Sequence, residues 1–360
     1  MIERLLRREV MEVPPYVPGK SAGEIAERFG IPEESIVKLA SNENPLGVPP
    51  AAVEALRSAA EEVNLYPEPF ADELRRALAG YVGVPEECIL VGNGSDDLLE
   101  QCAKAFLTPG DSAVLTPPTF SYYRILVQMY GSRCVEVPMV EGEEEYAFPE
   151  SLPEAASGAK LVFLCSPNNP TGNVVQRSLL EELLELETVV VLDEAYAEFA
   201  GESFAPLVRH HENLVVTRTF SKAFGLAGVR VGYCLASEEL VGYLARLRQP
   251  FSVSLLAQVA ALAALRDEPF LRRSVEMVRE GREYLGGELR RLGARVYASR
   301  ANFLLFRTPR GDLPEELLKR GVIVRGCRSF GLDDTYVRVS VGTPEQNRRF
   351  VEALEEVLTQ

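Results

Sequence analysis

The sequence predicts an α/β protein with a mostly parallel central sheet flanked by helices, followed by a smaller α+β domain. Three observations predict this arrangement. The 360 residues suit about two domains, and their 46% hydrophobic and 25% charged content is typical of a globular protein. Short apolar runs alternate with helical patterns through the middle of the chain. After Pro250 the pattern changes to two long helical segments and then short strands with helices between them.

Seven short apolar runs are the expected strands of the large sheet. The run Val189–Leu192 is almost continuously apolar, which is typical of a strand buried on both faces and hence of a parallel sheet. A helical pattern over 177–187 separates it from the run before it, and the three together predict a βαβ unit. The expected strands are Cys88–Val91, Ala113–Leu115, Val135–Val137, Leu161–Cys165, Val189–Leu192, Leu214–Thr217 and Val231–Leu235.

The C-terminal part combines two helices with short strands. We expect a large domain over residues 44–249 and a smaller domain built from residues 1–43 and 250–360. The first 43 residues are punctuated by proline and glycine and are too few to fold alone, so they are expected to pack on the C-terminal part or on a partner subunit. The expected helices are 254–266 and 269–292, and the expected strands are 303–306, 322–324 and 336–341.

Net charge, the length of apolar runs and cysteine usage argue against nucleic-acid-binding, membrane-spanning and disulfide-linked proteins. The net charge of −15 disfavours nucleic-acid binding, although a few arginines in a pocket can still attract a small anion. No apolar run is long enough to span a membrane, and Met1–Val10 lacks the apolar core of a signal peptide. The six cysteines form no CxxC pair and suggest no disulfide framework. A cytoplasmic protein without bound metal is therefore expected.

The histidine count limits the available chemistry. His210 and His211 are the only histidines, and they follow a polar connection where a solvated pair is expected. Acid–base chemistry therefore falls to a lysine, a tyrosine, a carboxylate or a cofactor.

The segment Val91–Asp97 follows the first expected strand and contains two glycines that allow a tight turn. Ser95 is expected to cap a helix over 96–106, and the free N–H groups at that helix start would suit a phosphate. An ordinary capped turn is the alternative, because Asp96 and Asp97 also complement the helix dipole.

Two further motifs follow expected strands, at the carboxyl edge where open α/β sheets bind ligands. The loop 165–172 (CSPNNPTG) would present the amide of Asn169, although its asparagines and glycine also suit a plain turn. Asp193 ends the next strand, where a buried carboxylate needs a partner. A cationic ring nitrogen or a structural arginine would supply it.

The fourth motif is the segment 217–230, TRTFSKAFGLAGVR. A lone lysine is usually a solvated charge, but Lys222 lies in an apolar, glycine-rich stretch. A lysine whose pKa is lowered by its surroundings forms a Schiff base with an aldehyde.

In this order and spacing the four motifs resemble those of the fold type I aminotransferases, which depend on pyridoxal 5'-phosphate (PLP). The resemblance covers residues 16–342 and implies that Lys222 holds PLP as a Schiff base. It also implies that Asp193 pairs with the ring nitrogen, and that Asn169 and Tyr196 contact the ring hydroxyl. Lys222, Asp193 and Tyr196 are thus the expected catalytic residues. The remaining cofactor contacts implied are Phe120 on the ring, and Gly94, Ser95, Asp96, Thr219, Ser221 and Arg230 at the phosphate.

The resemblance also implies a homodimer. Tyr66 corresponds to a residue that reaches the phosphate of the neighbouring subunit's cofactor, so each site would be shared.

Within this fold type the motifs are most similar to those of the histidinol-phosphate aminotransferases. That similarity implies ping-pong transamination in histidine biosynthesis, from L-histidinol phosphate and 2-oxoglutarate to imidazole-acetol phosphate and L-glutamate. The motifs are PYVPGK (15–20), SNENP (41–45), YPEP (66–69), SKAF (221–224) and VRVSVG (337–342).

Such a pair of substrates requires one site to accept a phosphate and a carboxylate, ideally through arginine forks. By resemblance, Arg338 and Arg325 are the expected anion ligands, Tyr16 is expected near the substrate phosphate, and Asn302 is a further substrate-binding candidate. Surface ion pairing is the alternative for both arginines.

Other activities on the same fold stay open at this point. Threonine-phosphate decarboxylases and aromatic amino-acid aminotransferases share most of these motifs, and substrate choice depends on a few pocket contacts. A non-catalytic ligand-binding relative is a more remote alternative, since such proteins often carry a DNA-binding domain for which this chain has no spare segment.

Overall fold

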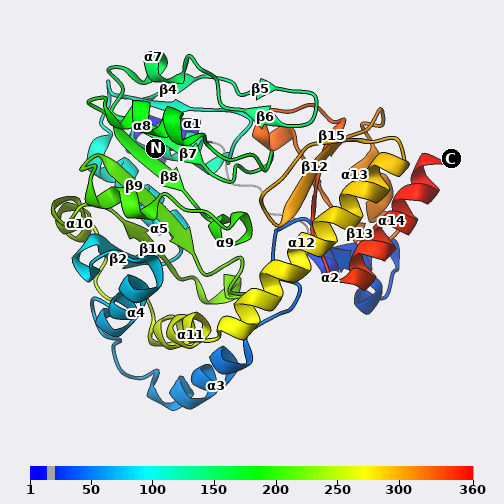
Figure 1. Cartoon of the computed structure of the whole chain (residues 1–360), viewed down its shortest axis with the longest axis horizontal. Coiled ribbons are helices and arrows are strands. Elements are labelled where there is room, and N and C mark those ends of the chain that lie inside the picture. Colours follow the sequence, from blue (N-terminus) through cyan, green and yellow to red (C-terminus); the bar gives the residue numbers. More distant parts are fainter. Residues whose placement is uncertain (14–20, 360) are drawn as a thin grey trace.

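A seven-stranded sheet forms the centre of the larger part of the molecule (Figure 1). The structure, a computed structural model, describes residues 1–13 and 21–359. The strand order is β2–β10–β9–β8–β7–β3–β4, and β10 runs antiparallel to the other six strands, which are parallel to one another. The seven predicted strands and the mostly parallel sheet are confirmed. The strands are β2 (Ile89–Gly92), β3 (Ser112–Leu115), β4 (Arg133–Glu136), β7 (Leu161–Cys165), β8 (Val189–Asp193), β9 (Leu214–Thr219) and β10 (Gly232–Leu235).

Helices cover both faces of this sheet, which explains the continuous apolar strands. Successive residues of a strand point to opposite faces, so Val162 and Val190 join one core while Phe163 and Val191 join the other. One face carries α5 (Ser95–Phe106), α6 (Tyr122–Met129) and α10 (Glu238–Ala245). The other carries α4 (Asp72–Val82), α7 (Leu152–Ala156), α8 (Arg177–Leu184) and α11 (Leu255–Arg266), and α11 also packs on α3 (Pro50–Ala59). The core around the large sheet thus extends beyond residue 249.

A four-stranded antiparallel sheet forms the second part of the molecule. Its order is β11–β12–β15–β14. The helix α12 (Glu268–Arg291) runs from α11 to this sheet and packs there beside α14 (Figure 1). The elements are β11 (Arg295–Val296), β12 (Phe303–Arg307), α13 (Leu313–Leu318), β13 (Val322–Ile323), β14 (Arg325–Gly326), β15 (Tyr336–Ser340) and α14 (Pro344–Leu358).

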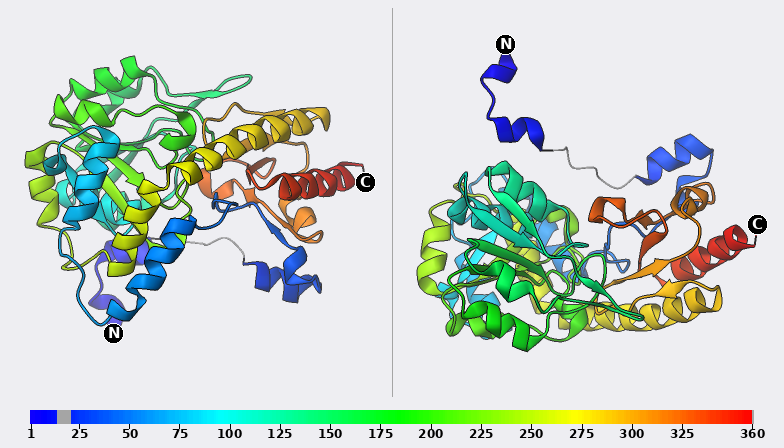
Figure 2. Two further views of the ribbon diagram at one scale, coloured as in Figure 1. Left: turned by 60° about the horizontal axis from the view of Figure 1, so that its bottom comes forward. Right: turned by 90° about the horizontal axis from the view of Figure 1, so that it is seen from above.

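The N-terminal segment contacts both parts (Figure 2). The helix α2 (Ala22–Phe29) buries Ile25 against α13, and β1 (Val37–Lys38) pairs in parallel with β13, so this stretch packs on the C-terminal part as expected. The helix α1 (Arg8–Glu12) instead lies on α6, where the Arg7 guanidinium donates to the Met129 carbonyl at 2.7 Å.

The other short strands and α-helices are β5 (Val140–Glu141) and β6 (Tyr146–Ala147), which form a hairpin, and α9 (Ala197–Ala200). Among the described residues, every helix is too short or too polar to span a lipid bilayer.

Candidate active site

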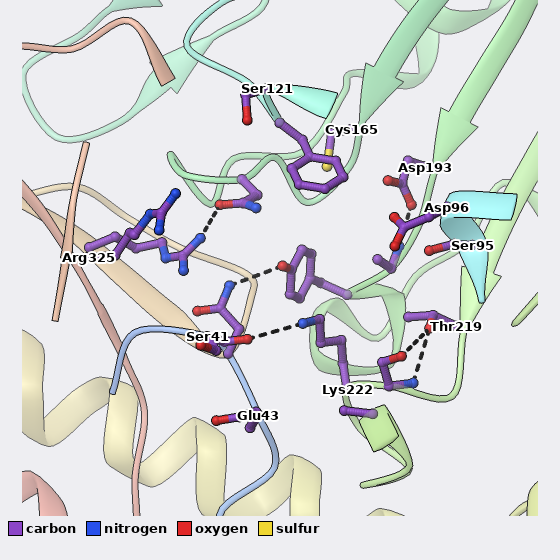
Figure 3. A pocket seen from close by; sticks show the side chains of 18 of the residues that line it. Ser41, Glu43, Ser95, Asp96, Ser121, Cys165, Asp193, Thr219, Lys222 and Arg325 are labelled. Carbon is purple, nitrogen blue, oxygen red and sulfur yellow. Dashed lines mark hydrogen bonds between the residues drawn. The ribbon is translucent and has the colours of Figure 1, made fainter. Parts of the chain in front are cut away.

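A cavity of about 270 Å³ lies where the carboxyl ends of β7, β8 and β9 face the small sheet. Figure 3 shows Asp193, Ser95 and Thr219 on one side of it and Arg325 on the other, with Lys222 and Ser41 below. The structure brings most of the predicted site residues together here. Those that line the cavity are Ser95, Asp96, Phe120, Asn169, Asp193, Tyr196, Thr219, Ser221, Lys222, Arg230, Arg325 and Arg338.

Lys222 projects into the cavity from a tight loop that follows β9. The loop is possible because Gly225 has a φ of +67° and lies against Gly47, where a Cβ would come within 2.2 Å of the carbonyl oxygen. The Lys222 amine donates to the Ser41 carbonyl at 3.2 Å. Burial, followed by the positive charge of Arg338, lowers the pKa of Lys222 to about 8. The neutral fraction of this amine near pH 7 is therefore much larger than that of an ordinary lysine, which suits a nucleophile and a base.

Asp193 is buried at the end of β8, and every donor that it has among the described residues is neutral. The Tyr123 hydroxyl donates at 2.7 Å, and the Thr217 hydroxyl and Ala195 N–H both donate at 3.2 Å. Burial raises the pKa of Asp193 to about 6. Among the described residues, no lysine or arginine forms an ion pair with it, so nothing supports the structural-arginine alternative. A buried carboxylate without a cation is suited to a ligand that brings one.

The start of α5 and the end of β9 form an anion cradle. The helix begins at Ser95, and the turn before it needs Gly94, whose φ is +82° and whose Cβ position lies 2.7 Å from the Arg230 guanidinium. Arg230 pairs with Asp96 at 3.1 Å, and the Thr219 hydroxyl donates to Ser221 at 3.0 Å. The predicted capping role of Ser95 is wrong. Its side chain makes no cap hydrogen bond and instead borders the cavity, because a glycine occupies the cap position.

Two arginines form the opposite wall. Arg325 and Arg338 are paired in register on β14 and β15, and side chains that are opposed in this way project from the same face of a sheet. Phe330 packs beside both guanidinium groups, at 5.8 and 5.6 Å from its ring centre. Arg338 is buried and donates to Asn169 Oδ1 at 2.5 Å. Both arginines therefore face the cavity, which argues against simple surface ion pairing.

Three predicted residues are placed differently, and a fourth lies outside the described part of the chain. Gly94 supports the cradle behind Arg230 without lining the cavity. Tyr66 is 82% exposed, away from this cavity, and stacks on Phe251 at 4.6 Å. Asn302 is buried behind the cavity, where its amide donates to the Asn42 carbonyl at 3.0 Å. Tyr16 lies outside the described residues.

The segment 41–43 was missed as part of the site, although it lies in the SNENP motif. Ser41, Asn42 and Glu43 line the cavity between β1 and the lysine loop. Asn42 has a φ of +55°, which asparagine tolerates better than most residues. The asparagine in this motif could therefore have indicated an unusual backbone conformation at the site. Tyr123, the partner of Asp193, was also missed, because it lies in an apolar pattern that predicts only a core helix.

Comparisons with known proteins match almost the whole chain. The model of the family "Aminotransferase class I and II" matches residues 34–354. The chain belongs to this family. A histidinol-phosphate aminotransferase of Methanothermobacter thermautotrophicus is 42% identical to this chain, with 98% of this chain and 97% of the relative aligned.

Among the solved structures that are similar to this aminotransferase are two with different activities. The histidinol-phosphate aminotransferase of Sinorhizobium meliloti in complex with PLP has a TM-score of 0.85 at 25% identity, covering 98% of this chain and 97% of its own. The L-threonine-O-3-phosphate decarboxylase of Porphyromonas gingivalis has a TM-score of 0.79 at 29% identity, and the match covers 90% of this chain and 100% of that one.

The cavity of this aminotransferase fits PLP, which confirms the cofactor expected from the sequence. Its residues offer an amine of lowered pKa for an aldehyde and a buried carboxylate without a cationic partner for a ring nitrogen. The cradle of Ser95, Thr219 and Arg230 offers hydroxyl and guanidinium donors for a phosphate.

Proposed function

We propose that this aminotransferase transfers the amine of L-histidinol phosphate to 2-oxoglutarate in histidine biosynthesis. The observation that carries the proposal is a pair of neighbouring arginines, Arg325 and Arg338, in the same cavity as a lysine of lowered pKa. Such a pair suits both a phosphate and a carboxylate. Full-length relatives named for this activity support it. The six free thiols fit a reducing compartment, and we place the reaction in the cytoplasm.

The predicted cofactor-binding residues of the cavity divide the proposed work among them. Bound PLP supplies an electron sink for negative charge at the amine-bearing carbon of the substrate. Asp193 would hold the proton on the ring nitrogen, and Asn169 and Tyr196 would hold the ring hydroxyl. Phe120 would cover the ring, and the Lys222 amine would take up at Nζ the proton lost by the substrate carbon and then donate it, as a general acid, to the cofactor. The Gly94–Asp96 turn, Thr219, Ser221 and Arg230 would hold the phosphate.

The substrate anion would bind at the arginine wall. The proposed large domain, residues 44–249, carries the lysine, whereas the proposed smaller domain, residues 1–43 and 250–360, carries both arginines. Arg338 is the stronger ligand candidate, because it is buried and its contact to Asn169 links the anion site to the ring site. Arg325 would add a second fork, and Tyr16 remains a further substrate-binding candidate, whereas Asn302 lies behind Asn42 and does not border the cavity.

Replacing Arg338 by glutamine should raise the KM for both L-histidinol phosphate and 2-oxoglutarate by about 100-fold, because each substrate loses a charge-assisted contact. Arg325→Gln should raise both KM values less. Arg328→Gln is the matched control, since that arginine is exposed and paired with Asp334 outside the cavity. Steady-state kinetics measure these values, and an Arg338→Gln variant with unchanged KM for both substrates would remove Arg338 from the site.

We also propose a homodimer in which Tyr66 completes the partner's site. The apolar side chains of Val63, Leu65, Tyr66 and Phe251 are all more than one-third exposed and lie around one surface groove. A second copy of this chain would bury this surface. Tyr66 is far too exposed to serve its own cavity, which fits a role in the neighbouring one.

Hybrid dimers test this arrangement. Lys222→Ala and Tyr66→Ala chains, refolded together, should regain activity above that of either parent, because one of the two sites then has both residues intact. Light scattering should give twice the 39.7 kDa of one chain. A monomeric protein, or hybrids no more active than the Tyr66→Ala parent, would contradict the proposal.

The proposed substrate is tested by comparing donors at saturating 2-oxoglutarate. We expect kcat/KM for L-histidinol phosphate to exceed that for phenylalanine and tyrosine by at least about 100-fold, because a single carboxylate offers the two arginines less charge and fewer acceptor oxygens than a phosphate. Phosphothreonine should release no carbon dioxide. Carbon dioxide release, or a preference for an aromatic amino acid, would assign the chain to one of the alternatives.

A further inference from the structure

Asn42 joins the small sheet to the tyrosine of the cavity through its backbone and its side chain. It is 1% exposed and adopts the left-handed conformation. Its backbone N–H donates to the Ser340 hydroxyl at 2.9 Å, and its carbonyl accepts from the Asn302 amide at 3.0 Å. Its side-chain amide donates to the Tyr196 hydroxyl at 3.0 Å. A buried, conformationally unusual residue with this many polar contacts is firmly held in one position.

The Ser340 hydroxyl determines which way the Asn42 amide points. A hydroxyl has one proton to donate, and Ser340 Oγ already accepts from the Asn42 backbone N–H. Among the described residues its only other hydrogen-bond partner is the Asn42 side chain, so the Ser340 proton has an acceptor only if Asn42 Oδ1 faces it, at 2.7 Å. With the amide oxygen committed to Ser340, the NH₂ group is the one that faces Tyr196.

This orientation in turn determines the direction of the Tyr196 proton. The phenol oxygen accepts from Asn42, so its own proton is directed elsewhere, and the Tyr196 side chain borders the cavity. We infer that Asn42 is a positioning residue: it holds the Tyr196 hydroxyl as a donor toward the ring oxygen of bound PLP. This inference rests on the proposed role of Tyr196. It explains why residue 42 is an asparagine: the side-chain amide donates to the phenol oxygen and leaves the phenol proton for the cofactor.

Deleting the side chain of Asn42 should change the bound cofactor through Tyr196. Asn42→Gly keeps the positive φ and both backbone hydrogen bonds and removes only the amide. A donated hydrogen bond stabilises a deprotonated ring oxygen, so a weakened bond should raise the pH midpoint of the cofactor's visible absorbance. The charged or titratable groups that act on the Tyr196 phenol are Arg338, Cys165, Asp193 and Lys222. The Lys222 amine lies 5.9 Å from the centre of the Tyr196 ring.

The test is a spectrophotometric pH titration of four PLP-loaded proteins: wild type, Asn42→Gly, Tyr196→Phe and the double variant. We expect Asn42→Gly and Tyr196→Phe to raise the midpoint, each by about one pH unit at most. The double variant should match Tyr196→Phe alone, because Asn42 has no phenol to act on there.

Asn42→Asp provides a second variant that keeps the shape and the left-handed conformation. Its carboxylate would accept the phenol proton and turn it away from the cofactor, so the midpoint should rise at least as far as in Asn42→Gly. The inference is overturned if Tyr196→Phe shifts the midpoint and neither Asn42 variant does, or if Asn42→Gly shifts it equally in the Tyr196→Phe background. A wild-type protein that PLP does not colour would instead contradict the proposed function.

Discussion

Lys222→Ala should lower the rate of transamination by at least about 10⁴-fold. The substitution removes the amine whose pKa is about 8 and which lies inside the cavity, so neither the covalent attachment nor the proton transfer at Nζ remains. The fold should persist, because the Lys222 amine makes one hydrogen bond, to the Ser41 carbonyl, at the edge of the cavity. The variant should still bind PLP without a covalent bond.

Single-turnover kinetics and mass spectrometry measure this effect. After borohydride reduction the wild-type chain should carry the added mass of the cofactor on the peptide that contains Lys222, and the variant should carry none. Lys319→Ala is the matched control, because that lysine is paired with Glu316 on the surface. Transamination by Lys222→Ala at the rate of the control would show that the assigned lysine is wrong.

Asp193→Asn should lower turnover by about 10²- to 10⁴-fold, because a neutral amide no longer holds the ring nitrogen protonated. The same substitution should stabilise the cofactor-free protein at high pH. Burial raises the folded-state pKa of Asp193 from 3.8 to about 6, so the carboxyl group favours folding below pH 4 and this advantage is lost as the pH rises through 6. The amide suffers no such loss and can still meet the Tyr123 hydroxyl, which can accept as well as donate.

Thermal or denaturant unfolding of cofactor-free protein at pH 4 and pH 8 measures this second effect. We expect the free energies of unfolding of wild type and Asp193→Asn to be similar at pH 4, and the variant to gain about 3 kcal/mol at pH 8. Adding PLP should reverse the order at pH 8, because only the aspartate gains a cationic partner. A variant that is as active as wild type would contradict the role of Asp193 at the ring nitrogen.

The parts of the fold with regular patterns could be predicted from the sequence. The β7–α8–β8 unit is an example, because its strands are buried on both faces and its helix has a regular apolar pattern. Residues at the carboxyl ends of these strands, such as Asn169 and Asp193, could be located for the same reason: the edge of a parallel sheet determines where they meet.

Contacts between distant segments could not be predicted in the same way. Asn42 and Tyr196 are 154 positions apart, and their hydrogen bond depends on how β1 docks beside β13. The packing of α11 on α3 and α4 likewise depends on tertiary contacts, since its alanine-rich pattern does not tell which core it joins. The capping error at Ser95 arose because serine at a helix start suits both a cap and a ligand site.

The most direct test of the proposed reaction is a single-turnover absorbance experiment. The PLP-loaded protein is mixed with L-histidinol phosphate in the absence of 2-oxoglutarate, with phosphothreonine, phenylalanine and tyrosine in parallel. The proposal predicts rapid loss of the visible absorbance with L-histidinol phosphate and its recovery when 2-oxoglutarate is added. Visible absorbance that is lost only with another of these amines would contradict the proposed donor.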